Sequence, residues 1–181
     1  KQHMQDTALL SYLLYEDGKI VIDEITPEDR FGGMFRDSSK FHSQSVAKTL
    51  IGYVAGHAIC KGYIDSVDSR LNDWPVLENT LYHNQKLIDV LNMASGTQAY
   101  FEGSNRFTNS NRAVTSPTVE DIMKREFKGS KKSSSIYNYN NLNPNVVGSY
   151  LIYKLGADNF QALLDDVFKN KARIEGDVFF L

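Results

Sequence analysis

The sequence has few of the features that mark several large classes of protein. Lys and Arg (20) nearly balance Asp and Glu (22), and no basic stripe occurs, so nucleic acid is not an expected partner. No apolar run reaches the length that a membrane-spanning helix needs. The single cysteine, Cys60, cannot form an internal disulfide. The four histidines lack the spacing of metal ligands, so a metal site is not expected.

The length of the chain suits one domain with a core of its own. Its 181 residues contain no internal repeat, no heptad pattern and no sign of a second domain. We interpret residues 1–181 as a single α/β domain of the α+β type. Residues 1–42 are expected to supply N-terminal strands of an antiparallel sheet, and residues 43–175 a mostly helical region flanking it.

Two apolar segments near the N-terminus predict a β-hairpin. Asp17-Gly18 separates them, and this dipeptide favours a tight turn in which both central residues have positive φ. We therefore expect strands at about residues 7–15 and 19–25.

Helices are predicted farther along the chain from apolar spacing and from capping residues. A Lys61-Gly62 pair ends the first of them, and Pro144 falls in the first turn of a later one. The predicted helices cover about residues 45–60, 85–92, 143–155 and 158–170, and a short one starts near Ser116 or Thr118.

Ser45 and Lys48 are three residues apart at the start of the predicted helix 45–60. On one helical face their side chains can meet, and free N–H groups of a first turn suit a developing oxyanion. The helix has the apolar spacing of a buried element, and a poorly solvated Lys has a lowered pKa that lets it activate a serine. The Ser-x-x-Lys pattern is short, however, and about one match is expected by chance. The alternative is a helix-capping Ser beside an exposed Lys.

Further motifs follow Ser45-x-x-Lys48 in a fixed order. A Lys-Gly-Tyr-Ile-Asp-Ser-Val-Asp run at 61–68 closes the helix, and Leu-Ile-Asp-Val-Leu-Asn-Met-Ala-Ser-Gly stands at 87–96. Tyr-Asn-Asn-Leu-Asn-Pro-Asn-Val-Val-Gly at 139–148 is the last. In this order, with the N-terminal hairpin, they resemble the serine β-lactamase and penicillin-binding-protein-like hydrolases, in particular the class C-like branch with its esterases, carboxypeptidases and amide-oligomer hydrolases.

The resemblance implies a role for each matching residue. Ser45 would be the acylated nucleophile, Lys48 its activating partner, and Tyr139 a second acid or base that passes the proton to the leaving group. Asn141 would orient Lys48 and the substrate carbonyl, and Tyr100 would line the substrate pocket. The implied reaction is hydrolysis of an ester or amide, in a small molecule or a peptide, without a cofactor. The resemblance also favours a periplasmic or secreted location.

The chain departs from the family pattern in two places. Asn140 stands where the family commonly has Ser, and no Lys-Thr-Gly or His-x-Gly element occurs in the sequence. In the family that element lies on a late strand and supplies the second oxyanion donor. We therefore interpret the chain as an incomplete domain, truncated before its C-terminal strands. The first residue is Lys1 and not Met, which leaves open the removal of an upstream segment.

Other readings of these residues stay open. The chain could be a catalytically silent binding or sensor domain of the same fold, or an α/β domain with coincidental motifs. Tyr82-x-Asn84 also fits the Tyr-x-Asn pattern. His57 and Cys60 could suggest a thiol nucleophile, although Cys60 fits better as a small apolar helix residue. His42 is close to Ser45 in sequence.

Overall fold

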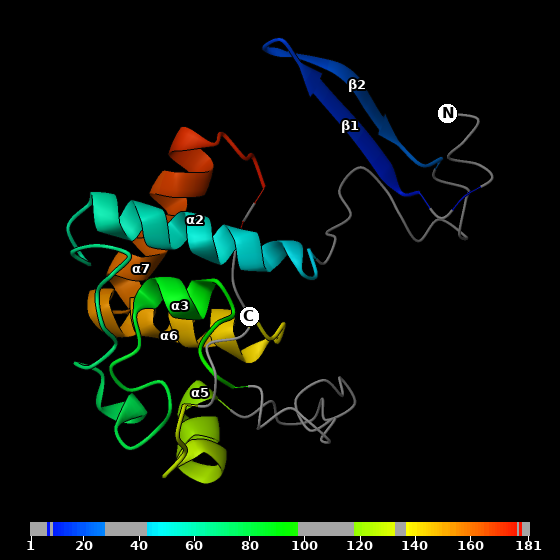
Figure 1. Ribbon diagram of the computed structural model, residues 1–181. Coiled ribbons are helices and arrows are strands. Elements are labelled where there is room, and N and C mark those ends of the chain that lie inside the picture. The colour runs from blue at the N-terminus through cyan, green and yellow to red at the C-terminus, as the bar shows by residue number, and fades with distance from the viewer. Residues whose placement is uncertain are drawn as a thin grey trace. The chain divides into compact units, whose positions relative to one another are not determined.

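The computed structural model describes residues 7, 9–27, 43–97, 118–132, 137–176 and 178. These residues form helices and a two-stranded antiparallel sheet, which confirms the predicted mixture of helix and strand (Figure 1). The backbone divides into two units, Lys1–Gln44 and Ser45–Leu181.

The first unit contains the predicted hairpin. Strand β1 (Ser11–Glu16) pairs antiparallel with β2 (Lys19–Ile25), and the register shifts once, between Leu14 and Tyr15. The turn residues Asp17 and Gly18 have φ values of 48° and 81°. Both are positive, as the Asp-Gly turn predicts, because this turn follows the right-handed twist of the paired strands.

Helix α2 (Val46–Cys60) opens the second unit and matches the predicted helix closely. It buries one face, formed by Ile51, Val54, Ala55 and Ala58. At its end the Gly62 N–H donates to the Ile59 carbonyl, and the Tyr63 N–H donates to the Ala58 carbonyl. This pair of hydrogen bonds requires a residue in the left-handed conformation directly after the helix. Gly62 adopts that conformation, with a φ of 76°.

Helix α6 (Leu142–Leu155) is the centre of the second unit. Pro144 lies in its first turn as predicted, and Gly156 ends it with a φ of 77°. Helices α2, α3 (Leu87–Leu91), α5 (Val119–Ile122) and α7 (Ala157–Leu164) all contact α6 (Figure 1). Because so many elements pack against it, Val146, Val147 and Leu151 are fully buried.

The shorter elements show where apolar spacing is a poor guide. Thr118 caps α5 through a reciprocal pair of bonds with Asp121, so Thr118 and not Ser116 is the cap. The predicted helix 158–170 begins as α7 but continues as a π-helical segment, η4 (Asp165–Lys171). A second π-helical segment, η3 (Met123–Phe127), follows α5, and a 3₁₀ turn, η2 (Pro75–Leu77), precedes α3. An apolar stripe specifies the buried side of a helix but not the number of residues in each turn.

In the part of the chain that the structure describes, no helix combines the length and the apolar character needed to cross a membrane.

Candidate active site

Ser45 occupies the residue directly before α2 and does not act as a cap. Its backbone is already helical (φ −68°, ψ −13°), and its hydroxyl forms no capping bond to the first turn. A capping serine normally has an extended backbone and accepts a hydrogen bond from an N–H two or three residues on. The capping alternative to a functional Ser45 is therefore not what the structure shows.

The Ser45 hydroxyl instead contacts two polar side chains. Lys48 Nζ donates to Ser45 Oγ at 3.3 Å, from one turn farther along α2. Tyr139 Oη donates to the same oxygen at 2.6 Å, from a segment 94 residues away. Lys48 Nζ also lies 5.0 Å from the centre of the Tyr139 ring. The structure thus brings together the serine, the lysine and the tyrosine of the two motifs.

The surroundings of Tyr139 favour its ionised form. Its hydrogen bond to Ser45, followed by its hydrogen bond and charge interaction with Lys48, holds the pKa of the phenol below its usual value. A nearby ammonium group stabilises a phenolate. The first turn of α2 contains no acidic residue that could compete with Tyr139 for the Lys48 ammonium group. The site can therefore hold a proton acceptor beside a serine hydroxyl.

The start of α2 is more exposed than its apolar spacing predicts. Ser45 is exposed, Val46 is 63% exposed, and Lys48 is only partly buried. The expectation of a poorly solvated Lys48 is therefore wrong for this structure. The reason is that the buried face of α2 begins at Ile51, so the first turn extends beyond the core.

Asn141 and Tyr100, the two residues expected to bind substrate, do not join the contacts among Ser45, Lys48 and Tyr139 that the structure describes. Asn141 is exposed and directly precedes α6, and within the described residues its side chain forms no hydrogen bond with Lys48. Tyr100 lies outside the described residues.

The second Tyr-x-Asn match is structural. Tyr82 is fully buried, and its hydroxyl donates to Asn143 Oδ1 at 2.7 Å. Burial is the main reason that the pKa of Tyr82 is raised well above its usual value. A buried phenol that keeps its proton stabilises the core and does not serve as a base.

A buried polar network below Tyr139 was not anticipated from the sequence. Asn140 and Asn143 are buried, and Asn143 Oδ1 accepts hydrogen bonds from the hydroxyls of Tyr82 and Ser95. The network's one signal in the sequence is the group of asparagines between 138 and 145, which we interpret as part of a motif and a helix start.

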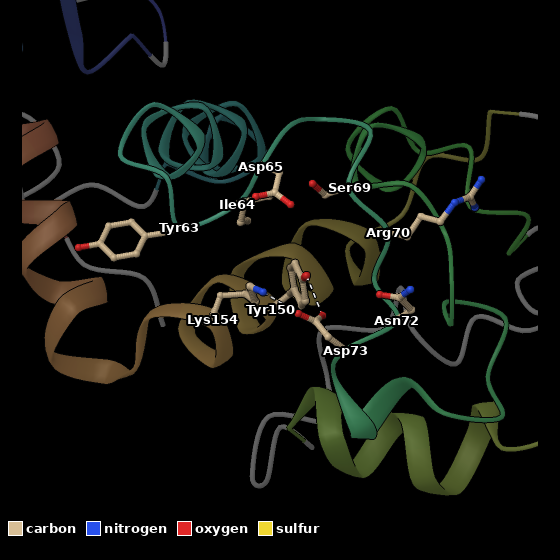
Figure 2. A pocket seen from close by; sticks show the side chains of 9 residues that line it. All are labelled: Tyr63, Ile64, Asp65, Ser69, Arg70, Asn72, Asp73, Tyr150 and Lys154. Carbon is tan, nitrogen blue, oxygen red and sulfur yellow. Dashed lines mark hydrogen bonds and ion pairs between the residues drawn. The ribbon is translucent and has the colours of Figure 1, made fainter.

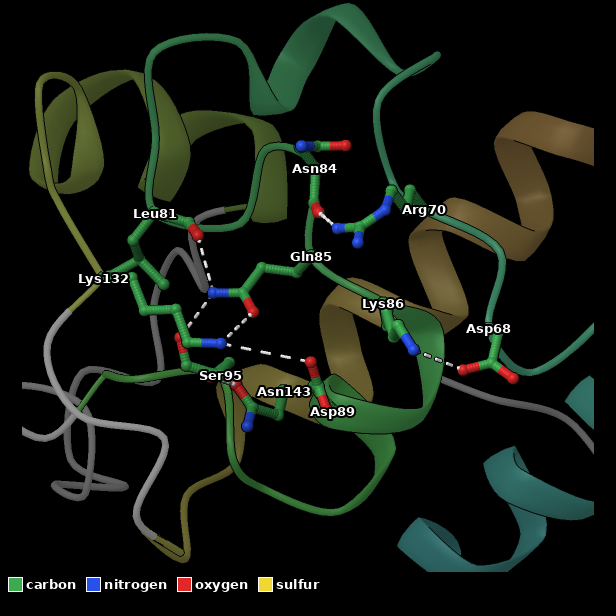
Figure 3. Close-up of polar contacts among 10 residues, drawn as sticks. All are labelled: Asp68, Arg70, Leu81, Asn84, Gln85, Lys86, Asp89, Ser95, Lys132 and Asn143. Carbon is green, nitrogen blue, oxygen red and sulfur yellow. Dashed lines mark hydrogen bonds and ion pairs between the residues drawn. The ribbon is translucent and has the colours of Figure 1, made fainter.

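The network continues through Gln85 (Figure 3). Gln85 Nε2 donates to the carbonyl oxygens of Leu81 (2.8 Å) and Ser95 (2.7 Å). Lys132 Nζ donates to Gln85 Oε1 at 2.9 Å. Gln85 is itself buried, so its amide fixes the 81–95 segment that supports Asn143.

The other candidate residues show no comparable arrangement. The ring of His57 contacts Tyr53 edge-on, with 4.7 Å between ring centres, and Cys60 is exposed at the last position of α2. His42 lies outside the described residues. Among the residues that are described, no group of three or more His, Cys, Asp or Glu side chains could hold a metal ion.

A small polar pocket of about 200 Å³ lies in the same unit (Figure 2). Three of its charged side chains, those of Arg70, Asp73 and Lys154, are engaged with protein atoms. Asp73 bonds Lys154 Nζ at 2.6 Å and the Tyr150 hydroxyl at 2.9 Å, and Arg70 donates to the Asn84 carbonyl. None of Ser45, Lys48 and Tyr139 lines it, so the pocket is not the binding cleft of the serine site.

Comparison with protein-family models gives no match for this chain, and comparison with curated proteins gives none either.

Proposed function

We propose that this protein is a serine hydrolase of the β-lactamase and penicillin-binding-protein-like type, close to the class C-like branch. It would cleave an ester or amide bond in a small molecule or peptide through an acyl-Ser45 intermediate. One observation carries the proposal: Ser45 Oγ accepts hydrogen bonds from both Tyr139 Oη and Lys48 Nζ. Tyr139 donates in this contact while its phenol is neutral. Once the phenol is ionised, Tyr139 Oη becomes the acceptor and can take the proton of Ser45 Oγ.

The steps follow from these contacts. Ser45 Oγ attacks the carbonyl carbon, and its proton passes to the Tyr139 phenolate, which the Lys48 ammonium stabilises. Tyr139 then donates this proton to the leaving alcohol or amine, and the bond to the leaving group breaks. In the second half Tyr139 accepts a proton from water and the water oxygen attacks the acyl carbon. Tyr139 then returns this proton to Ser45 Oγ as the Ser45–acyl bond breaks, which releases the carboxylic acid and restores the phenolate.

The tetrahedral oxyanion needs hydrogen-bond donors close to Ser45. The Lys48 N–H donates to the Ser45 carbonyl at 3.1 Å. The two N–H groups before it, on Val46 and Ala47, begin α2 and have no acceptor within that helix. These N–H groups, with the positive end of the helix dipole, are the donors that we assign to the oxyanion.

The experiment that tests the proposal is intact-mass spectrometry after treatment with a fluorophosphonate ester. We expect a single adduct on the wild-type protein, no adduct on Ser45→Ala, and an unchanged adduct on Ser43→Ala. Ser43 is a matched control because it is also exposed and lies two residues from Ser45. A folded wild-type protein, judged by circular dichroism, that gains no adduct would refute the hydrolase.

A second function is a binding or sensor domain that acylates without turnover; within residues 1–181 no Lys-Thr-Gly or His-x-Gly element supplies a second oxyanion donor. The two functions differ in deacylation. A hydrolase releases product repeatedly from p-nitrophenyl esters, D-amino-acid amides or a chromogenic β-lactam. A sensor forms one acyl adduct that persists in the mass spectrum.

A further inference from the structure

Asn140 is the buried neighbour of the exposed tyrosine at the site. Asn140 is 4% exposed, whereas Tyr139 is 54% exposed. The two side chains therefore face opposite sides of one short segment, one toward the core and one toward Ser45. A buried amide needs hydrogen-bond partners, and those of Asn140 are informative.

The Asn140 side chain bonds to the backbone on both sides of Tyr139. Its Oδ1 accepts from the Asn143 N–H at 2.9 Å, which is the capping bond for α6 that Asn141 does not make. Its Nδ2 donates to the Asn138 carbonyl at 2.8 Å and faces Thr97 Oγ1 at 3.4 Å. One amide thus links residues 138 and 143 and fixes the peptide units between them.

The same segment is attached to Met93. The Asn138 N–H donates to the Met93 carbonyl at 2.8 Å, and the Asn140 N–H faces Met93 Sδ at 3.5 Å. Met93 itself has a φ of 59°, in a region that side-chain-bearing residues rarely adopt. Asn143, the partner of Asn140, is held in turn by the hydroxyls of Tyr82 and Ser95.

We propose that Asn140 is a positioning residue for the serine site, whose buried amide holds the Tyr139 backbone so that the phenol meets Ser45 Oγ and Lys48. The catalytic meaning of this role rests on the proposed hydrolase function. The positioning itself does not, because it concerns the place of the phenol and can be measured without a substrate.

The side chain at this position determines how many of these bonds can form. A serine has one hydroxyl, which can accept from the Asn143 N–H but is too short to reach the Asn138 carbonyl as well. An alanine can make neither bond. The series Asn140, Asn140→Ser and Asn140→Ala therefore loosens the Tyr139 segment in two steps.

The test is the titration of the Tyr139 phenol, followed by ¹³Cζ NMR of protein labelled at its ten tyrosines. Tyr139→Phe identifies the signal. We expect the Tyr139 midpoint to lie below 10 in the wild type, to rise in Asn140→Ser, and to rise further toward 10 in Asn140→Ala. Asn145→Ala is the control, because Asn145 is an exposed asparagine in the first turns of α6, and it leaves the midpoint unchanged.

A second readout connects the position of the phenol to the reaction. The rate of fluorophosphonate labelling, per folded molecule, is expected to fall on the order of tenfold or more in Asn140→Ala, because small misplacements of a reacting group are costly. An unchanged Tyr139 midpoint in folded Asn140→Ser or Asn140→Ala would overturn the proposal and leave Asn140 as a helix cap alone. Should Asn140→Ala not fold, Asn140→Ser decides. A shifted midpoint in a protein that never labels would refute the hydrolase and keep the positioning role.

Discussion

At the scale of single residues, the ionisation of Tyr139 sets the expected pH dependence of the site. Contacts with Ser45 and Lys48 lower the pKa of this phenol, so the phenolate is populated at lower pH than for a free tyrosine. We predict that the labelling rate of Ser45 rises with pH to a plateau whose midpoint lies below 10. Tyr139→Phe should reduce the rate on the order of 100-fold, the size of a general-base contribution, and remove this pH dependence. The measurement is a time course of fluorophosphonate labelling, quenched at fixed times, at pH values between 6 and 10.

The charge of Lys48 gives a second prediction at this scale. Lys48 Nζ is 5.0 Å from the centre of the Tyr139 ring, close enough for its positive charge to stabilise the phenolate. Lys48→Met is expected to move the Tyr139 midpoint up toward 10, whereas Lys48→Arg keeps the charge and moves it less. The ¹³Cζ titration measures both. Equal midpoints in wild type and Lys48→Met would show that the lysine does not act on the phenol.

The residues of the site differ in how far the sequence reveals them. Short spacings and motif order drew attention to Ser45, Lys48 and Tyr139, which the structure places within hydrogen-bonding distance. The sequence marks Asn140 only as a departure from a family pattern. Its amide bonds to backbone groups, and backbone groups carry no sequence identity, so a sequence alone cannot reveal such a partner.

At the scale of elements, the glycines of α2 and of its end give opposite expectations. Gly56 is an exposed residue inside the helix, and an added Cβ would meet no atom within 4 Å. Gly56→Ala is therefore expected to stabilise the protein by about 0.5–1 kcal/mol, because alanine loses less backbone entropy than glycine. Gly62→Ala is expected to destabilise it, because Gly62 has a φ of 76°. Urea unfolding of both variants is the measurement. A destabilising Gly56→Ala would contradict the open surroundings described for Gly56.

The same elements show what periodicity can predict. Helix α2 was predicted to within about a residue, because an apolar stripe, a cationic last turn and a cap glycine agree on its limits. The hairpin was predicted because Asp17-Gly18 specifies its turn, although β1 begins at Ser11, later than expected. Segments η3 and η4 were not predicted, because a π-helical turn buries the same kind of residue as an α-helical one.

At the scale of the whole molecule, the serine site belongs to one unit. Ser45, Lys48 and Tyr139 all fall within Ser45–Leu181, and so does the buried network that supports Tyr139. The stability of that unit is therefore coupled to the geometry of the site. Contacts that join early and late segments of this unit can therefore affect both its stability and the geometry of the serine site.

Asp166 makes such a contact, because its side chain joins the residue after α2 to segment η4 near the end of the chain. Its carboxylate bonds Lys61 Nζ at 2.8 Å and Lys171 Nζ at 3.2 Å. The hydrogen bond from Lys61, followed by the one from Lys171, lowers the pKa of Asp166 to about 2, from an ordinary value of 3.8. A carboxylate whose pKa is lowered on folding stabilises the protein above its unfolded-state pKa, and this contribution is lost as the pH falls toward 2.

We therefore predict a specific pH dependence for Asp166→Asn. Above about pH 4 the variant should be less stable than the wild type to urea, and the difference should shrink as the pH falls from 3.8 toward 2. The control is Asp165→Asn, because Asp165 pairs with Lys169 inside η4 and does not connect α2 to it. Since Asp166 is partly exposed, high salt should also reduce the difference. A difference in stability that stays constant from pH 5 to pH 2 would show that Asp166 stabilises the protein by some means other than its charge.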